Sequence, residues 1–318
     1  MSLRVAVLGA SGFGRHHARW FHTLGCDVIA FLGSSPASIE TTDAALRDAF
    51  GFHGRGYTSL PELLAAERPD AVSVCTPPAL HGPHAREAIE AGCAVLCEKP
   101  FVMPPGATSS EVIAEARRLV EAAAERGVAL AVNTQYAAAA EPYRDLAGPL
   151  PASPSRFFAE MTSRLRPTGP RGREIWLDLM PHTVSMLLAL CPDAALRMDG
   201  IRGTIEEEGC EVRFQVATGG GACQVEMRVA KLAEPPFTRR FGLDDRVAEV
   251  GTAPDEQGVY RGYVRLGERE QRCDDFMRTS IERFCSAVRG EGAVLVDGQT
   301  ALRNTEMMLA TLDAVEGA

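Results

Sequence analysis

The chain has 318 residues, which exceeds the size at which one hydrophobic core usually stops growing, so two domains are expected. Hydrophobic residues make up 46% and charged residues 24%, a balance that excludes a disordered chain. The net charge of −9 is spread along the sequence without a basic stripe, which excludes nucleic acid as an expected partner. Without a stretch of membrane length or a signal peptide, we expect a cytoplasmic protein that does not bind membranes.

The N-terminal half alternates short β-branched runs with helical patterns, which is typical of a parallel sheet covered by helices on both faces. The expected strands are Arg4–Gly9, Asp27–Gly33, Ala71–Cys75, Ala94–Cys97 and Val128–Val132. The expected helices are Gly14–Leu24, Ala37–Phe50, Leu60–Glu67, His84–Ala91 and Ser110–Arg126. Residues 1–134 are therefore predicted to form a doubly wound α/β domain of the Rossmann type.

From about residue 135 the pattern changes to runs typical of antiparallel strands. The expected strands are Arg156–Met161, Cys210–Ala217, Ala222–Val229, Phe237–Leu243, Arg246–Gly251 and Val259–Leu266. The expected helices are Ile175–Leu190, Asp275–Val288 and Gln299–Val315. Residues 135–318 are predicted to form one α+β domain with a largely antiparallel open sheet that binds substrate and mediates assembly into a homodimer or homotetramer.

The nine cysteines are scattered and form no CxxC pair, which indicates reduced, packed thiols. Cys93 and Cys97 are four residues apart, but they flank an expected strand, where a shared ligand face is not expected. The sequence therefore predicts no metal site.

The segment VAVLGASGFGRHHARWF places a glycine-rich turn between an apolar strand and an amphipathic helix, the context that a dinucleotide-binding turn requires. The expected contacts come from Gly9, Ser11, Gly12, Phe13 and Gly14. Ser11 occupies the position of the second glycine in the usual G-x-G-x-x-G pattern, where its side chain crowds the phosphates and Gly12 relieves that crowding. Free N–H groups at the start of the helix would attract the pyrophosphate.

The end of the second strand determines which dinucleotide fits, because an acid there normally binds the adenosine ribose. This sequence has Gly33, Ser34 and Ser35 instead of an acid, and serine hydroxyls can donate to a 2′-phosphate. Arg15 or Arg47 would add positive charge. We therefore expect NADP to be preferred, with NAD as the alternative.

Three further runs carry chemistry: TPPALH from Thr76 to His81, EKP from Glu98 to Pro100, and DLMPH from Asp178 to His182. EKP follows an expected parallel strand, at the edge of the sheet where open α/β sheets bind ligands. Together with the glycine turn, in this order along essentially the whole chain, these runs resemble the Gfo/Idh/MocA family of oxidoreductases.

The resemblance implies roles for individual residues of the first domain. Glu98 would lie near the nicotinamide ribose, Thr76, Pro77 and His81 would border the cofactor, and Lys99 would be catalytic. The alternative is that Lys99 is an ordinary surface lysine and that the proline-rich run only starts a helix.

Asp178 and His182 are four residues apart on an expected helix, so their side chains lie on one face, one turn apart. The spacing alone is compatible with a structural pair or a catalytic unit. The resemblance implies that His182 is the general acid/base and that Asp178 orients it. The family usually has glycines just before this aspartate, whereas the chain has Ile175, Trp176 and Leu177, which would reshape the pocket.

The expected reaction is hydride transfer between nicotinamide and a hydroxyl or carbonyl carbon of a sugar, a cyclitol or a related polyol. His182 would move the hydroxyl proton and Lys99 would stabilise the alkoxide. One alternative is a semialdehyde-type dehydrogenase, which needs a cysteine nucleophile near a histidine, and none is evident in the sequence. The other is a non-catalytic dinucleotide sensor or scaffold of the same fold.

Overall fold

The computed structural model describes residues 2–256 and 260–317. The chain forms two compact units. Unit 1 contains residues 1–133 and 277–302, and unit 2 contains residues 134–276 and 303–318. The passage from unit 1 to unit 2 lies beside the predicted boundary at residue 134, but the segment 277–302 belongs to unit 1 although the sequence analysis placed it in the second domain.

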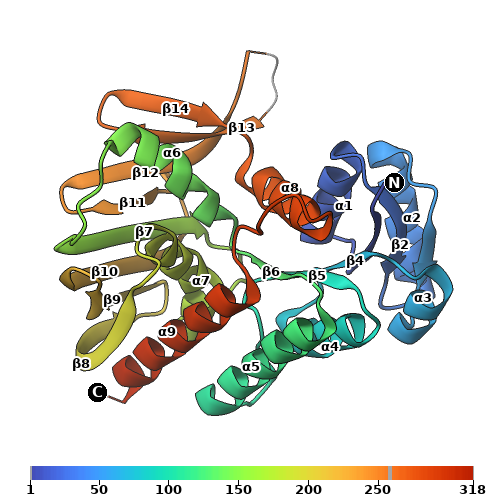
Figure 1. Ribbon diagram of the computed structural model, residues 1–318, viewed down its shortest axis with the longest axis horizontal. Coiled ribbons are helices and arrows are strands. Elements are labelled where there is room, and N and C mark those ends of the chain that lie inside the picture. The colour runs from blue at the N-terminus through green and yellow to red at the C-terminus, as the bar shows by residue number, and fades with distance from the viewer. Residues whose placement is uncertain (1, 257–259, 318) are drawn as a thin grey trace. The chain divides into compact units, whose positions relative to one another are not determined.

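Unit 1 is built on a six-stranded sheet in the order β3-β2-β1-β4-β5-β6, in which neighbouring strands are parallel (Figure 1). Its strands are β1 (Arg4–Leu8), β2 (Asp27–Leu32), β3 (Arg55–Tyr57), β4 (Ala71–Val74), β5 (Ala94–Glu98) and β6 (Leu130–Asn133). Its helical segments are α1 (Phe13–Thr23), α2 (Pro36–Phe50), α3 (Leu60–Glu67), the 3₁₀ turn η1 (Pro78–Leu80), α4 (His81–Glu90), α5 (Ser109–Arg126) and α8 (Phe276–Val288). The predicted α/β fold of the first domain is confirmed.

Helix α8 completes the core of unit 1. Its residues Ile281 and Phe284 are fully buried, and the Phe284 ring meets the Phe21 ring of α1 edge-on at 6.3 Å between centroids. Figure 1 shows α8 beside α1, although more than 250 residues separate Phe21 from Phe284. The parallel sheet therefore receives part of its apolar cover from the C-terminal region.

Unit 2 contains an eight-stranded sheet in the order β14-β13-β12-β11-β7-β10-β9-β8, antiparallel except for the parallel pair β7 and β10. Its strands are β7 (Arg156–Arg164), β8 (Ala195–Ile205), β9 (Gly209–Thr218), β10 (Gly221–Leu232), β11 (Arg239–Leu243), β12 (Arg246–Pro254), β13 (Tyr260–Leu266) and β14 (Arg269–Cys273). Its helical segments are η2 (Gln135–Ala139), α6 (Ala140–Ala147), α7 (Arg173–Leu190) and the larger part of α9 (Gly298–Glu316). The predicted largely antiparallel open sheet is confirmed.

Besides the short 3₁₀ turns η1 and η2, four elements were not predicted from the sequence: β3, α6, β8 and β14. Strand β3 has three residues, and β8 is an edge strand with almost no buried side chain, so neither shows an apolar alternation. Edge strand β14 has the charged sequence REQRC. Of the predicted strand Val259–Leu266, Val259 lies outside the described residues and the rest forms β13.

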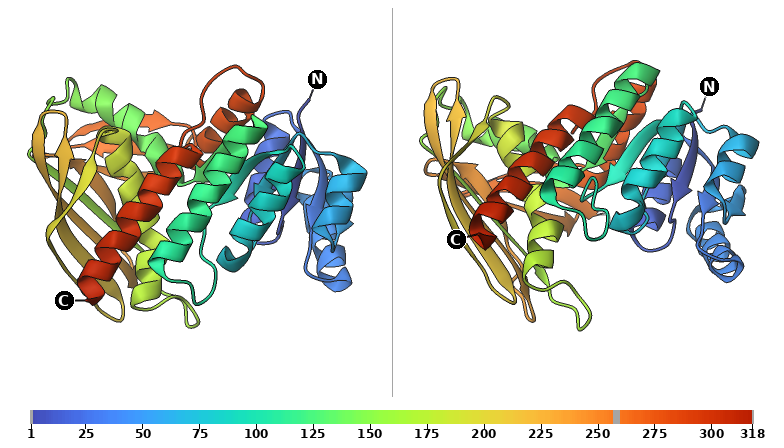
Figure 2. Two further views of the ribbon diagram at one scale, coloured as in Figure 1. Left: turned by 60° about the horizontal axis from the view of Figure 1, so that its bottom comes forward. Right: turned by 90° about the horizontal axis from the view of Figure 1, so that it is seen from below.

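Helix α7 lies on one face of the large sheet, with the C-terminal part of α9 beside it (Figure 2). The indole Nε1 of Trp176 donates to the carbonyl oxygen of Met308 at 3.1 Å, and the amide of Asn304 donates to the carbonyl oxygen of Pro181 at 2.8 Å. Ile175 and Trp176 are fully buried. Two of the three bulky residues thus fill the core of unit 2, whereas Leu177 is half-buried, and their effect on the pocket stays a prediction.

Candidate active site

The glycine turn after β1 is sterically determined. Gly9 has a φ of +80°, and a Cβ at this position would lie 2.8 Å from the carbonyl oxygen of Cys75. A Cβ on Gly14 would overlap the carbonyl oxygen of Gly9. Only glycine therefore permits the close approach of α1 to β1 and β4.

The outer part of this turn forms an open cradle. Ser11, Gly12 and Phe13 are exposed, and a Cβ on Gly12 would have no atom within 4 Å. Helix α1 begins at Phe13 without a side-chain cap and without an acidic residue in its first turn. The backbone N–H of Gly14 donates to the carbonyl oxygen of Ser11 at 3.1 Å. The start of α1 without a side-chain cap or an acidic residue fits the pyrophosphate of a dinucleotide. The exposed position of Ser11 leaves this cradle open.

The loop after β2 carries no carboxylate between Gly33 and Ser35. Ser35 is the N-cap of α2, and its hydroxyl accepts from the backbone N–H of Ser38 at 3.2 Å. Ser34 is exposed, and its hydroxyl lies 3.4 Å from the Ser38 hydroxyl. Of the two serines predicted to bind the cofactor, Ser34 is thus the more available, because capping already occupies the Ser35 hydroxyl.

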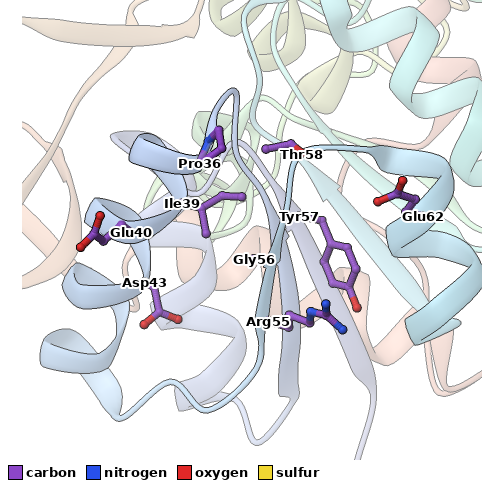
Figure 3. Close-up of a pocket in the computed structure, with 9 residues that line it drawn as sticks. All are labelled: Pro36, Ile39, Glu40, Asp43, Arg55, Gly56, Tyr57, Thr58 and Glu62. Atoms are coloured by element: carbon purple, nitrogen blue, oxygen red, sulfur yellow. The ribbon is translucent and has the colours of Figure 1, made fainter.

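Arg47 is poorly placed to add charge at this loop. It lies in the last turn of α2, roughly 16 Å along the helix from its first residue, and its guanidinium pairs with Asp43. A cavity of about 450 Å³ lies beside α2 and β3, as Figure 3 shows. Its lining includes the acids Glu40, Asp43 and Glu62, which would repel a phosphate. Arg55 also lines this cavity, so its lining carries both signs of charge. The part of Arg47 in phosphate binding stays a prediction, which its pairing with Asp43 disfavours.

The carboxylate of Glu98 ends β5 and is held inside unit 1. Its Oε1 lies 2.9 Å from Nε2 of His17 and 2.6 Å from the amide nitrogen of Asn133, which donates to it. The backbone N–H of Lys99 donates to its Oε2 at 3.3 Å. Nδ1 of His17 lies 2.9 Å from the Ser73 hydroxyl. The EKP run is therefore fastened to α1, β4 and β6 at once.

His17 and Glu98 form a charged pair at neutral pH. Burial of His17 disfavours its cation, but interactions with Cys75 and Glu98 outweigh burial and raise the pKa of His17 to about 10. Burial likewise disfavours the Glu98 carboxylate, but hydrogen bonds from His17 and Asn133 and the charge of His17 lower its pKa to about 2. Nε2–H of the imidazolium donates to Glu98 and Nδ1–H to Ser73.

The TPPALH run forms a turn that is stabilised by the buried side chain of His81. Nδ1 of His81 lies 2.7 Å from the carbonyl oxygen of Pro100, and Nε2 lies 2.8 Å from the carbonyl oxygen of Thr76. Burial lowers the pKa of His81, and the two carbonyl partners counteract that effect. His81 thus ties the turn after β4 to the EKP run, while Thr76 and Pro77 remain partly accessible.

Asp178 and His182 lie in α7 of unit 2, one turn apart as predicted. The structure adds a partner that the sequence analysis missed: Nζ of Lys231, on β10, donates to Oδ2 of Asp178 at 2.5 Å. His182 is buried, and its ring meets the Tyr136 ring edge-on at 5.2 Å between centroids. The guanidinium of Arg239 lies over the Tyr136 ring, 5.3 Å from its centroid.

Of the site residues that the sequence analysis missed, Lys231 could have been found from the sequence, whereas His17 and Asn133 could not. Of the 33 lysines and arginines in the chain, only Lys99 and Lys231 are lysines. A residue type this rare at an expected strand end is a signal that composition alone provides. No such signal marks His17 or Asn133, whose partner Glu98 is distant in the sequence.

Other kinds of site find no support in the described residues. These residues contain no group of three His, Cys, Asp or Glu side chains placed to bind a metal ion. None of the helices they form is long and apolar enough to cross a membrane. Cys75 does lie near His17, contrary to the expectation that no cysteine has a histidine nearby, but Glu98 and Ser73 engage the ring nitrogens of that histidine.

Comparison with known proteins identifies the family. The family described as "Oxidoreductase family, NAD-binding Rossmann fold", Gfo/Idh/MocA, matches residues 3–134. The UDP-N-acetylglucosamine 3-dehydrogenase of Acidithiobacillus ferrooxidans is 28% identical over 99% of this chain and 97% of its own length. Residues 3–134 therefore match the Gfo/Idh/MocA family, as the sequence analysis predicted, and the 28% identical relative extends the likeness over the rest of the chain. The chain is therefore an oxidoreductase with a nicotinamide dinucleotide site in unit 1, which disfavours the non-catalytic and semialdehyde-type alternatives.

Further members of the Gfo/Idh/MocA family align over less of the chain or share only the fold. The inositol 2-dehydrogenase of Corynebacterium glutamicum is 35% identical over 36% of this chain and 32% of its own length, so the chain spans about a third of that relative. The solved structure of the Acidithiobacillus ferrooxidans enzyme superimposes with a TM-score of 0.76 at 24% identity, covering 100% of this chain and 99% of that one. A 3-ketoreductase of Actinomadura kijaniata, solved with NADP and TDP-benzene, gives 0.71 at 19% identity, covering 100% and 98%.

Proposed function

We propose that this oxidoreductase transfers a hydride between a nicotinamide and a hydroxyl or carbonyl carbon of a sugar, a cyclitol or a related polyol. The observation that carries the proposal is the EKP run at the carboxyl end of β5, fastened by the His17–Glu98 pair beside an open dinucleotide cradle. The relatives that act on UDP-N-acetylglucosamine and inositol support this substrate class.

The residues proposed to hold the dinucleotide all belong to unit 1. The turn from Ser11 to Gly14 would bind the pyrophosphate through the N–H groups of Ser11, Gly12 and Phe13. Thr76 and Pro77 would border the cofactor, and Ser34 would face the adenosine ribose. The loop from Gly33 to Ser35 contains no acidic residue, which supports a preference for NADP. When bound, the dinucleotide supplies a hydride donor or acceptor.

The proposed catalytic residues are Lys99, Asp178 and His182. His182 takes the proton from the substrate hydroxyl during oxidation and returns it during reduction, a role that suits imidazole because its ordinary pKa is near neutrality. The ammonium of Lys99 stabilises the negative charge that develops on the substrate oxygen. Asp178 lies one helical turn before His182 and supports its charge and orientation.

The test is an assay of nicotinamide absorbance with NADP and NAD. The proposed substrates are UDP-N-acetylglucosamine, myo-inositol and methyl β-D-glucoside, and the ketones of the same compounds serve for the reverse direction. We expect turnover of at least one compound, and at least about 10²-fold slower turnover by the Lys99→Ala variant. Tight binding of NADPH without turnover of any compound in either direction would contradict the proposed reaction.

We further propose a cytoplasmic homodimer or homotetramer that assembles through the sheet of unit 2. The sheet face opposite α7 carries Phe158, whose ring lies under the guanidinium groups of Arg156 and Arg240 at 5.2 and 5.8 Å. Aromatic rings with arginine are enriched in protein interfaces. Light scattering would measure the subunit number, and a monomer at micromolar concentration would contradict this part of the proposal.

A further inference from the structure

Lys231 differs from every other basic side chain of unit 2. It is the only lysine in this unit, since the other lysine, Lys99, lies in unit 1. The ion pairs on the face of the same sheet opposite α7 use arginine, as in Arg228 with Glu226 and Arg240 with Glu160. Arginine therefore provides charge where charge alone is needed. A lysine at position 231 indicates a need for a compact ammonium with three rotatable donors.

The ammonium of Lys231 is removed from solvent. Its side chain is 11% exposed, whereas that of its partner Asp178 is 29% exposed. One of the three N–H groups of Nζ donates to Oδ2 of Asp178 at 2.5 Å. Among the described residues, Asp178 is the hydrogen-bond acceptor of this ammonium. A largely buried ammonium with donors left over is unfavourable unless another acceptor reaches it.

The neighbouring strand presents a second polar group with the same deficit. Ser163 of β7 is the ladder partner of Lys231, so the two side chains lie on the same face of the sheet. This face meets α7, because Thr183 of α7 donates to the sulfur of Met227, four residues before Lys231. The hydroxyl oxygen of Ser163 is buried without a hydrogen-bond partner among the described residues.

An ammonium with spare donors and a hydroxyl that can donate or accept together match the oxygen of an alcohol or a carbonyl. Both lie on the sheet face against α7, and the carboxylate that fixes the ammonium is one helical turn from His182. One turn corresponds to about 5 to 6 Å between side-chain positions. That spacing suits a second oxygen on the ring of a polyol whose reacting oxygen is at His182.

We propose that Lys231, with Ser163, binds a second hydroxyl of the substrate ring and thereby determines which polyols are accepted. The inference rests on the proposed function, because it assigns a contact to the substrate of that reaction. Lys231 is a substrate-contacting residue in this scheme, and Asp178 holds its ammonium in place. A structural lysine that only neutralises Asp178 would instead be indifferent to the substrate.

The first test follows binding and needs no turnover. Protein labelled with ¹³C at lysine Cε contains two such carbons, and the Lys231→Arg variant assigns them. Myo-inositol and UDP-N-acetylglucosamine are titrated into the holoenzyme with NADP bound. We expect one of them to shift the Lys231 resonance, and the Ser163→Ala variant to weaken that binding. Turnover of a probe without any shift of this resonance would overturn the inference while leaving the proposed function intact.

The second test separates substrate recognition from a structural role. The accepted substrate and its monodeoxy analogues are compared in wild type, Lys231→Met and Lys231→Arg. In wild type, kcat/KM should fall strongly when one particular hydroxyl of the substrate is missing. The ratio of kcat/KM for the substrate to that for this deoxy analogue should be at least about tenfold smaller in both variants. Arg228→Met is the matched control on the same strand, since its side chain is exposed on the opposite face, and its discrimination should equal that of wild type.

The outcomes remain distinguishable from failure of the proposed reaction. Variants that lose activity equally toward every analogue, with discrimination intact, would overturn the inference. A shift of the Lys231 resonance without turnover would support the binding site and contradict the reaction. If both probes cause no shift and are not turned over, the inference for these ligands and the proposed function are both overturned. Unchanged NADPH affinity in Lys231→Arg would show that the variant is folded.

Discussion

Nε2 of His17 and Oε1 of Glu98 lie 2.9 Å apart, although 81 residues separate them in the sequence. The contact joins the helix that follows the glycine turn to the strand end that carries Lys99. A change in either residue therefore affects both halves of the proposed nicotinamide site. His17 is fully buried and the Glu98 side chain is only 14% exposed, so solvent screens the pair weakly.

The His17–Glu98 pair makes stability depend on pH in a defined window. The pKa of His17 is raised to about 10, so its contribution is fully present below its ordinary pKa of 6.5 and is lost as pH rises toward 10. The pKa of Glu98 is lowered to about 2, so its contribution is present above 4.5 and is lost as pH falls toward 2. We expect the difference in unfolding free energy between wild type and His17→Gln to be largest from pH 4.5 to 6.5 and to shrink by pH 10.

Urea unfolding of both proteins across that range measures this difference. Asp43→Asn, which removes a surface ion pair with Arg47, is the control and should change the free energy of unfolding little at any pH. A difference for His17→Gln that stays constant from pH 6.5 to 10 would show that His17 is neutral in the folded protein.

Removal of either proposed catalytic group should slow turnover without preventing cofactor binding. His182→Ala and Lys99→Ala should each reduce kcat by at least about 10², because each removes proton transfer or charge stabilisation from the transition state. NADPH fluorescence titration should give a dissociation constant for His182→Ala within about threefold of wild type. Near-normal turnover by either variant contradicts its assignment.

Two glycines of the turn should respond differently to alanine. At Gly14 an added Cβ overlaps the Gly9 carbonyl oxygen, so Gly14→Ala should destabilise the fold. At Gly12 the φ of +55° costs roughly 1 to 2 kcal/mol for alanine, but no protein atom is in the way. The Cβ would instead enter the cradle, so we expect Gly12→Ala to weaken NADPH binding.

Gly51→Ala is the matched control for the backbone strain at Gly12. Gly51 has a φ of +73° and also has no atom within 4 Å of an added Cβ, but it ends α2 on its C-terminal side. Equal losses of thermal stability in the two variants, with NADPH affinity reduced only in Gly12→Ala, are expected. Unchanged affinity in Gly12→Ala would remove the pyrophosphate from this turn.

The end of β2 should control the choice of dinucleotide. A carboxylate at the exposed position 34 would repel a 2′-phosphate and bind a 2′-hydroxyl. We expect Ser34→Asp to reduce NADPH affinity at least about tenfold and to leave NADH affinity equal or improved. Arg47→Ala should change neither affinity, since that guanidinium pairs with Asp43. A loss of NADPH binding in Arg47→Ala would place the phosphate on α2 instead.

The sequence by itself determined the parts of this protein that depend on local pattern. Alternating strands and helices predicted the parallel sheet of unit 1, and the order of glycine turn, EKP and DLMPH predicted the family. The i, i+4 spacing of Asp178 and His182 required only that the segment be helical. The sequence pattern did not predict β8 or β14, because exposed edge strands have little apolar periodicity.

Only the tertiary structure decided which distant residues became partners. Glu98 meets His17 and Asn133 because β1, β4, β5 and β6 are neighbours in one sheet, and α8 returns to unit 1 to cover Phe21. Lys231 meets Asp178, 53 residues away, because β10 passes under α7. Hydrophobic periodicity specifies which face of an element is buried. It does not specify against which element that face packs, and the polar contacts of the site follow from that packing.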